Sequence, residues 1–380
     1  MAKPSIRWAE IINAQPMFDV LTLANKREEL GNYVARMEIG DTPGFQNNAV
    51  NKILLKSSQE PHRYSPSKGE PFLIDALFET QWKQFSKNDY DISIAPANFL
   101  VMAALAAVTS PGDTVLIPDP GFPTYKLACD FLGLKTLSYS LYPNTSNDFP
   151  TINYSDNENK DLPTVIIVNN PSNPLGIAYD GKQILSGIKP LIDNGVKVII
   201  DETYINLVYD STIALIPSID AIRIRSFSKE HCAPGLRIGY VLANLAFSKT
   251  IADFVSLTIS CVPRFIQIAI AEYLSMDESN IFRESVIAEM KRRYDLLFNT
   301  MPTDSILVKP NSAFYAMIET GNGDSSFRFF LDKNVATCPG SKFGSAASSA
   351  LRVSIAGNSK NLNNDFEMLH SAYMQWYKNI

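Results

Sequence analysis

Histidine and cysteine are scarce in this 380-residue chain, which has three histidines and four cysteines. No pair of them stands at a zinc-ligand spacing such as CxxC or HExxH, so we expect no metal site. Four scattered cysteines in a chain of this size do not indicate a disulfide framework either. If the protein is an enzyme, its chemistry must therefore come from lysine, aspartate, tyrosine and arginine, or from a bound cofactor.

Long apolar runs and clusters of basic charge are also absent. The longest apolar run, residues 99–108, has half the length of a membrane span, which needs about 20 residues. Thirty-four lysines and arginines face 39 aspartates and glutamates, for a net charge of −5, and no basic cluster indicates a nucleic-acid partner. The N-terminus lacks the apolar core of a signal peptide. We therefore expect a cytoplasmic protein without nucleic-acid or membrane partners.

Short apolar, β-branched runs alternate with amphipathic segments through the first two thirds of the chain. This alternation predicts an α/β fold in which helices cover both faces of a mostly parallel sheet. We expect strands at residues 114–118, 164–169, 196–200, 221–225 and 236–243, and helices at residues 100–109, 125–134 and 183–194.

The pattern changes in the last third of the chain, which suggests a second domain. There we expect helices at residues 279–300 and 365–377, and strands of a smaller sheet at residues 305–310, 313–318 and 351–355. We predict a large domain at residues 45–279, a small domain at residues 280–380, and an N-terminal segment, residues 1–44, that packs on the small domain. The polar residues 144–160 indicate a surface loop.

Chemically useful side chains follow three of the predicted strands. Asn173 stands in a rigid Pro- and Gly-containing turn, Asp201 directly after a buried strand, and Lys229 after another, with Arg237 beyond it. Taken singly, each has a simpler interpretation, as a connecting loop, a helix cap or a surface lysine. Together they lie where ligands bind in such sheets, at the carboxyl ends of the strands. An amide, a carboxylate, a lysine and an arginine suit a pyridine cofactor with a phosphate and a carbonyl, because a buried lysine loses its proton readily and attacks carbonyls.

A series of motifs then resembles one known family along nearly the whole chain. The chain is similar to the class I/II aminotransferases, which are pyridoxal 5'-phosphate (PLP)-dependent enzymes of fold type I. The matching segments, in the order of that family, are PMFDVL (16–21), MEIGDTPGF (37–45), HRYSPSKGEPFLIDAL (62–77), SPGDTVLIPDPGFPTY (110–125), NNPSNPLG (169–176), DETY (201–204), SFSKEHCAPGLRIGY (226–240), NSAFYAM (311–317), VATCPGSKFG (335–344) and LRVSIAG (351–357). The resemblance implies a large domain with a mostly parallel seven-stranded sheet and a small α/β domain.

The resemblance also implies the residues around the cofactor ring. Lys229 is the Schiff-base lysine that carries the substrate proton, and Asp201 pairs with the pyridinium nitrogen. Tyr204 and Asn173 donate to the phenolic oxygen of the cofactor, and Phe122 stacks on the ring.

Further roles follow from the same resemblance. The phosphate is held by Ser226 and Arg237 and by the backbone amides of Ala97 and Asn98 at a helix start, and Ser228 is also within reach of it. Arg352, with Gly40 and Asn173 beside it, grips the α-carboxylate of the substrate. Tyr64 reaches the phosphate from the other subunit, which implies a homodimer.

Some positions depart from the family pattern. The phosphate cup, residues 94–99, lacks its usual hydroxyl donor, which the Asn98 amide could replace. Phe99 is a candidate to face the substrate, Ser312 stands where the family often has glycine, and His231 either lines the pocket or packs within its loop.

These residues leave the reaction open, since the same core serves several outcomes. Transamination with a 2-oxo acid is the first expectation. The alternative is a lyase or cyclase that eliminates and then cyclises a hydroxylated amino acid, as capreomycidine synthases do. A ligand-sensing module of a transcription regulator would need a DNA-binding domain, for which the match leaves no room. Glu202 or Asp41 at the pocket entrance could suit a cationic substrate side chain.

Overall fold

The structure, a computed structural model, describes residues 16–42, 44–142, 149–150, 152, 162–357 and 361–378. Within these residues the strands form a seven-stranded, a three-stranded and a two-stranded sheet. The expected surface loop at residues 144–160 lies outside the described residues except for 149, 150 and 152. No helix of the described part is long and apolar enough to span a membrane.

The seven-stranded sheet is mostly parallel, in the order β2-β8-β7-β6-β5-β3-β4. Only β8 runs against both of its neighbours in this sheet. The strands are β2 (Tyr90–Ala95), β3 (Thr114–Asp119), β4 (Lys135–Ser140), β5 (Val165–Asn169), β6 (Lys197–Asp201), β7 (Ile222–Ser226) and β8 (Gly239–Asn244). The sequence predicts β3, β5, β6 and β7 to within one residue at each end, because strands buried on both faces appear as continuous apolar runs.

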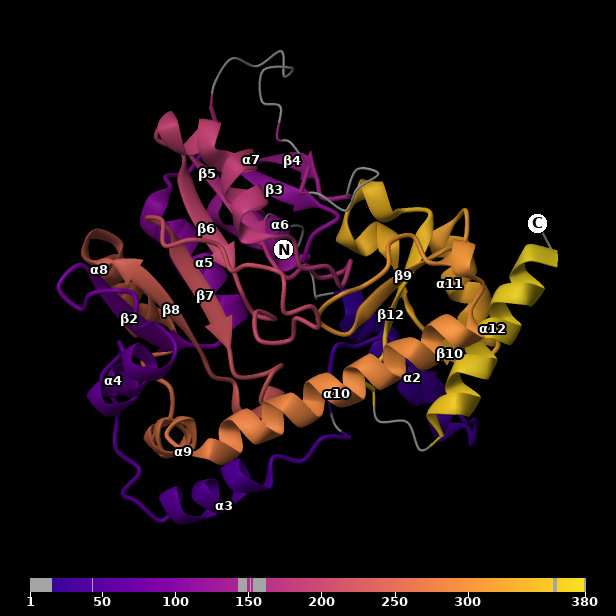
Figure 1. The fold of residues 1–380 in the computed structure, drawn as a ribbon, viewed down its shortest axis with the longest axis horizontal. Helices are drawn as coiled ribbons and strands as arrows, with labels where there is room; N and C mark the ends of the chain where they lie inside the picture. The colour runs from indigo at the N-terminus through magenta and orange to yellow at the C-terminus, as the bar shows by residue number, and fades with distance from the viewer. Residues whose placement is uncertain are drawn as a thin grey trace, which may run out of the picture.

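Helices cover both faces of this sheet, as Figure 1 shows. On one face α5 (Ala97–Val108), α6 (Thr124–Leu132) and α8 (Leu245–Thr258) pack in a common core. On the other face lie α7 (Gly181–Asp193), α4 (Pro71–Thr80) and α9 (Arg264–Leu274). The carboxyl ends of the parallel strands therefore remain the accessible edge of the sheet.

The three-stranded sheet is antiparallel and consists of β11 (Cys338–Pro339), β12 (Ala350–Ser354) and β9 (Tyr315–Glu319). It packs with α10 (Asp277–Thr300), α11 (Gly323–Asp332) and α12 (Leu362–Lys378). In Figure 1 it lies beside the seven-stranded sheet, and α10 runs along below both.

The N-terminal part of the described chain belongs to two regions. β1 (Ala35–Arg36) pairs in parallel with β10 (Val335–Ala336), and α2 (Pro16–Glu29) contacts β10 and β11. β1 and α2 thus lie against the C-terminal part of the chain. By contrast, α3 (Asn48–Ser57) packs on α9.

Some sequence-based element predictions are wrong. Residues 305–310 form no strand: the short 3-10 helix η2 (Thr303–Ser305) is followed by a single bridge from Ile306 to Ile318. Two predicted strands begin later than expected, because Arg237 and Ala313 adopt left-handed φ angles of 54° and 52° that an extended strand cannot contain. β2 and β4 were not predicted at all.

Candidate active site

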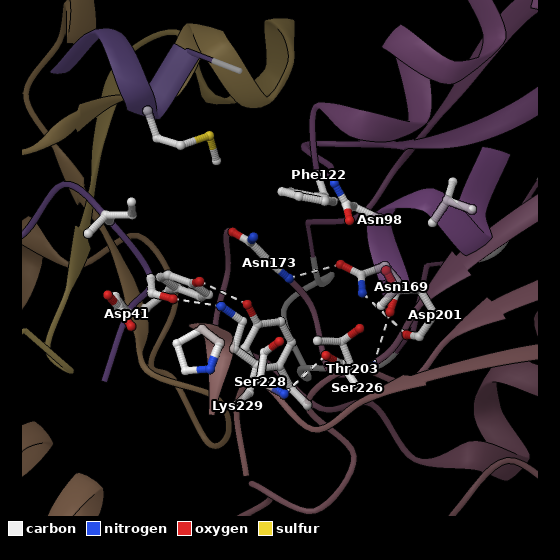
Figure 2. Close-up of a pocket in the computed structure, with 18 of the residues that line it drawn as sticks. Asp41, Asn98, Phe122, Asn169, Asn173, Asp201, Thr203, Ser226, Ser228 and Lys229 are labelled. Atoms are coloured by element: carbon white, nitrogen blue, oxygen red, sulfur yellow. Dashed lines mark hydrogen bonds between the residues drawn. The ribbon is translucent and has the colours of Figure 1, made fainter. Parts of the chain in front are cut away.

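A cavity of about 430 Å³ opens at the carboxyl ends of β5, β6 and β7 and is closed on its other side by β9, β12 and the start of α2. Figure 2 shows the side chains of Asn169, Asp201 and Ser226, from the ends of β5, β6 and β7, gathered with Asn173, Ser228 and Lys229 around it. Twelve of the thirteen predicted site residues line it: Gly40, Ala97, Asn98, Phe122, Asn173, Asp201, Tyr204, Ser226, Ser228, Lys229, Arg237 and Arg352. Tyr64 does not.

Lys229 lies three residues beyond the end of β7, so the strand carries its amine to the cavity. Its Nζ donates a hydrogen bond to the carbonyl oxygen of Gly40 at 2.6 Å. Burial lowers the pKa of Lys229 to about 8, against the opposing effect of the Asp41 carboxylate. A substantial fraction of the amine is therefore neutral near physiological pH, and only the neutral amine is a nucleophile or a base.

Asp201 is the last residue of β6 and is buried at the floor of the cavity. Its Oδ2 accepts a hydrogen bond from the Tyr125 hydroxyl at 2.7 Å, and its Oδ1 accepts one from the backbone N–H of Thr203 at 3.0 Å. Burial raises the pKa of Asp201, and the bonds from Thr203 and Tyr125 act against that rise. The carboxylate is thus oriented by two donors.

Tyr125 is not among the residues predicted from sequence. It lies in the first turn of α6, three residues after Phe122, so the two rings share one side of that turn; they meet edge to face at 5.9 Å. The sequence did contain a signal for a role of this residue, because Tyr125 is the last residue of the family motif at residues 110–125. Its partner, however, is 76 residues away in the chain.

Arg352 on β12 is fully buried. Its Nη1 donates to Asn173 Oδ1 at 3.1 Å and its Nη2 to the carbonyl oxygen of Glu38 at 2.7 Å. The guanidinium lies between the rings of Tyr315 and Phe343, at 4.4 and 4.6 Å from their centroids. Among the described residues it has no carboxylate partner and its Nε has no hydrogen bond. Burying a cation without a carboxylate partner is energetically unfavourable, and an anionic ligand would supply the missing partner.

Two tyrosines fill the space between Arg352 and Asp201. The hydroxyls of Tyr204 and Tyr315 are hydrogen-bonded at 2.8 Å, and burial raises the pKa of Tyr204. A Cβ at Gly40 would stand 1.8 Å from the Tyr315 hydroxyl oxygen. Glycine is therefore required at position 40 for the backbone to approach both this ring and the lysine.

The opposite end of the cavity offers hydrogen-bond donors to an anion. Helix α5 begins there with Ala97 and Asn98, and no side chain caps its N-terminus. The Ser226 hydroxyl and Ser228 lie beside it, joined by a bond from the Ser228 N–H to Ser226 Oγ at 3.1 Å. Arg237 is exposed and its Nη2 contacts Asn98 Oδ1 at 3.4 Å. An uncapped helix start next to an arginine and hydroxyls suits a phosphate.

This donor set fits the cofactor that the resemblance implies. The cavity has a phosphate-compatible end, a buried carboxylate for a ring nitrogen, an aromatic side chain in Phe122, and a partly neutral amine for a carbonyl. The Arg352 guanidinium, which has no carboxylate partner within the described part of the chain and whose Nε has no hydrogen bond there, remains for a substrate carboxylate.

Two residues whose roles the sequence left open, Phe99 and His231, lie outside the cavity. Phe99 does not face the substrate site, because its ring packs on Phe254 at 5.6 Å in the core under α5 and α8. His231 packs within its loop, stacked on Phe227 and with its Nε2 3.2 Å from Glu230 Oε1.

Glu202 is not at the entrance either. It is buried on the other side of the sheet edge and pairs with Arg223 at 2.7 Å and Arg225 at 2.9 Å. Asp41 does line the cavity. Ser312 donates to the carbonyl oxygen of Gly176 at 3.0 Å and has a structural role.

Comparison with known proteins gives matches over most of the chain. A model of the family "Aminotransferase class I and II" matches residues 34–367. The chain is 30% identical over 375 residues to the (5-formylfuran-3-yl)methyl phosphate transaminase of Methanocaldococcus jannaschii, across 93% of this chain and 95% of that protein. It is 29% identical over 339 residues to the probable aspartate/prephenate aminotransferase of Aquifex aeolicus, across 83% and 84% of the two chains.

Solved structures match as well. An aromatic aminotransferase from Pyrococcus horikoshii OT3 has a TM-score of 0.82 at 25% identity, across 94% of this chain and 99% of that one. The aspartate aminotransferase from Thermus thermophilus has a TM-score of 0.85 at 21% identity, across 98% and 100%.

Proposed function

This chain belongs to the class I and II aminotransferases, and we propose that the cavity at the carboxyl ends of β5, β6 and β7 is its active site. The chain is a PLP-dependent transferase of fold type I that exchanges an amino group between an amino acid and a 2-oxo acid. The relatives named above are aminotransferases, so the lyase or cyclase alternative gains no support from them.

The observation that carries the site assignment is the set of charged groups that line the cavity together with Lys229. Its buried amine, with a pKa lowered to about 8, shares one cavity with a buried carboxylate and with an arginine that lacks a carboxylate partner among the described residues. No structural role explains why all three groups line one cavity.

The residues that would hold PLP divide by the parts of the cofactor. Ala97, Asn98, Ser226, Ser228 and Arg237 would hold the phosphate through amides, hydroxyls and a guanidinium. Asp201 would hold the proton on the ring nitrogen, Phe122 would cover one face of the ring, and Tyr204 and Asn173 would donate to the phenolic oxygen. When bound, the cofactor supplies an electron sink for the bond at the substrate Cα that loses its proton.

The remaining chemistry belongs to the side chains. Arg352 would grip the α-carboxylate with its planar fork, whose orientation the flanking rings of Tyr315 and Phe343 maintain. Lys229 Nζ, when neutral, would take the proton from the substrate Cα and would then deliver it to the C4′ atom of the cofactor. Tyr125 would keep the Asp201 carboxylate turned toward the ring nitrogen.

The subunit arrangement and the domain limits are also proposals. Tyr64 is 88% exposed and outside the cavity of its own chain, which supports the idea that it serves the cavity of a second subunit in a homodimer. The division into residues 1–44, 45–279 and 280–380 agrees with the two separate sheets and with the β1–β10 pairing. A cytoplasmic location stays a prediction.

The test uses purified protein loaded with PLP. We expect a visible absorbance band that an amino acid substrate bleaches, with release of its 2-oxo acid, and that 2-oxoglutarate or another 2-oxo acid restores. Lys229→Ala should lack covalently attached cofactor after borohydride reduction; attachment in that variant would contradict the assignment of the lysine. Release of ammonia without an acceptor would contradict transamination.

A further inference from the structure

One carboxylate outside the proposed active site connects the seven-stranded sheet to the segment that leads into β12. Asp119 is the last residue of β3. Its Oδ2 accepts hydrogen bonds from the backbone N–H and the hydroxyl of Ser345, at 3.2 and 2.7 Å, and its Oδ1 accepts one from the N–H of Ala346 at 3.1 Å. The partners are separated by 226 and 227 residues in the chain.

These bonds cap a 3-10 helix from outside. Helix η4 (Ser345–Ala347) follows Gly344, which has no side chain with which to cap it. Asp119 supplies the missing acceptor, in the manner of an aspartate at a helix N-cap. Gly344 has a φ of +139°, and a Cβ there would stand 2.0 Å from Asp119 Oδ1. Glycine at this position is therefore what lets the carboxylate reach the helix.

A second bond reinforces the connection. The N–H of Gly121, two residues after Asp119, donates to the carbonyl oxygen of Phe343 at 2.7 Å. Packing joins the two sides only in part. Ala347 of η4 belongs to the same buried cluster as Leu116 of β3, but a cavity of about 440 Å³ lies between residues 117–127 and residues 341–345. The hydrogen bonds therefore hold the two segments together where their facing surfaces are not packed against each other.

Each side of this connection carries a proposed active-site group. On the sheet side, Phe122 follows Asp119 by three residues and lines the cavity. On the other side, Phe343 is buried and its ring lies 4.6 Å from the Arg352 guanidinium. Phe122 also packs against the small cluster that contains Phe343.

We propose that Asp119 is a positioning residue for substrate binding: by capping η4 it fixes Phe343, and through Phe343 the guanidinium plane of Arg352, relative to the sheet that carries Lys229 and Asp201. The inference rests on the proposed function. The sheet side has other restraints, namely the Tyr125–Asp201 bond and the bond from the Leu141 N–H to the Asp119 carbonyl. Loss of the carboxylate therefore displaces the Arg352 side and leaves the cofactor side in place.

The experiment compares three variants of the PLP-loaded enzyme. Asp119→Ala removes all three acceptors, and Asp119→Asn keeps the shape and one acceptor oxygen. Ser341→Ala is the matched control, because Ser341 belongs to the same segment but its hydroxyl bonds to Asp324 at 2.8 Å and not across to β3. We measure the dissociation constant of an unreactive carboxylate analogue of the substrate, KM, kcat, and the dissociation constant of PLP.

For Asp119→Ala we expect the analogue dissociation constant and KM to rise about five- to tenfold, the size of effect usual for a lost cap. Asp119→Asn should fall between Ala and wild type, and the PLP dissociation constant should change by less than about twofold in both. Ser341→Ala should behave as wild type.

A purely structural role would give a different pattern. Unchanged analogue binding in Asp119→Ala, or equal losses of analogue and PLP binding, would overturn the proposal. If Asp119→Ala does not fold, Ser345→Ala removes the 2.7 Å hydroxyl bond alone, and its effect on KM should be smaller in the Asp119→Asn background, where only one acceptor oxygen remains for the donors of η4. Additive effects of those two substitutions would equally overturn it. Failure of the proposed function would instead show in the wild-type protein, as absence of cofactor binding or of amino transfer.

Discussion

Replacing Arg352 with lysine should weaken recognition of the substrate carboxylate while leaving the charge in place. The guanidinium is fully buried, and two aromatic rings at 4.4 and 4.6 Å hold its plane. Its Nη1 donates one hydrogen bond to Asn173 and its Nη2 donates one to the carbonyl oxygen of Glu38. The Nε–H and the second N–H of each Nη atom remain to bind a ligand. A lysine ammonium has the charge but not the planar fork.

The size of the effect follows from the lost hydrogen bonds. A hydrogen bond to a charged group contributes about 1.5–3 kcal/mol. Losing one of two bonds to the carboxylate, and part of the alignment of the other, should cost about 2–3 kcal/mol. At about 1.4 kcal/mol per tenfold change, this is a roughly 30- to 140-fold loss in kcat/KM for the amino acid.

The assay compares an amino acid with the matching amine that lacks the α-carboxylate, by following cofactor absorbance in single turnovers. Arg352→Lys should lower kcat/KM for the amino acid by the amount above and change the slow reaction of the amine by less than about threefold. Arg293→Lys is the control, since Arg293 is also buried but donates to backbone carbonyls of Ile355 and Gly357 outside the cavity. Equal losses for amino acid and amine would refute the assignment of Arg352 to the carboxylate.

Three further predictions follow from the geometry. Because burial lowers the pKa of Lys229 to about 8, borohydride-trapped attachment of PLP to the apoenzyme should rise with pH with a midpoint near pH 8, and a midpoint near 10.5 would contradict this. The free energy of unfolding of the apoenzyme should also increase with pH between about 8 and 10.5 because of Lys229, since in that range only the unfolded state holds the proton. Tyr125→Phe removes the 2.7 Å donor to Asp201 and should weaken PLP retention about tenfold in equilibrium dialysis, whereas unchanged retention would argue against a role in orienting the carboxylate. Glu202→Gln leaves its two buried arginine partners on β7 without a carboxylate and should lower the free energy of unfolding in urea by about 3 kcal/mol; a loss below about 1 kcal/mol would show that the pair contributes little.

The parallel strands could be located from the sequence because both of their faces are buried. β5 is apolar up to its last residue, Asn169, and is buried throughout. The edge strand β4 gives no such run, since Tyr139 is its only buried residue, and β2 begins with half-buried residues. An edge strand pairs on one side only, so its composition is less constrained and its presence is decided by the partner strand.

The neighbours Asp201 and Glu202 show what a motif leaves undecided. Both are acidic and both follow the same apolar run, and either could have been the carboxylate of the site. Successive side chains of an extended chain point to opposite faces, so only one can enter the cavity. In the structure the Asp201 side chain points into the cavity and contacts Tyr125, whereas the Glu202 side chain points to the arginines of β7.

Four features could be predicted without coordinates: the family resemblance, the α/β class, the strands at the centre of the sheet and most of the residues that line the cavity. These follow from local composition and from motifs that lie at strand ends. The tertiary structure decided which side chains face each other: the hydroxyl of Tyr125 on Asp201, the two rings on the guanidinium of Arg352, and the carboxylate of Asp119 on η4. Such contacts join residues far apart in the chain, and their geometry depends on how sheets and helices pack, which no local pattern of residues contains.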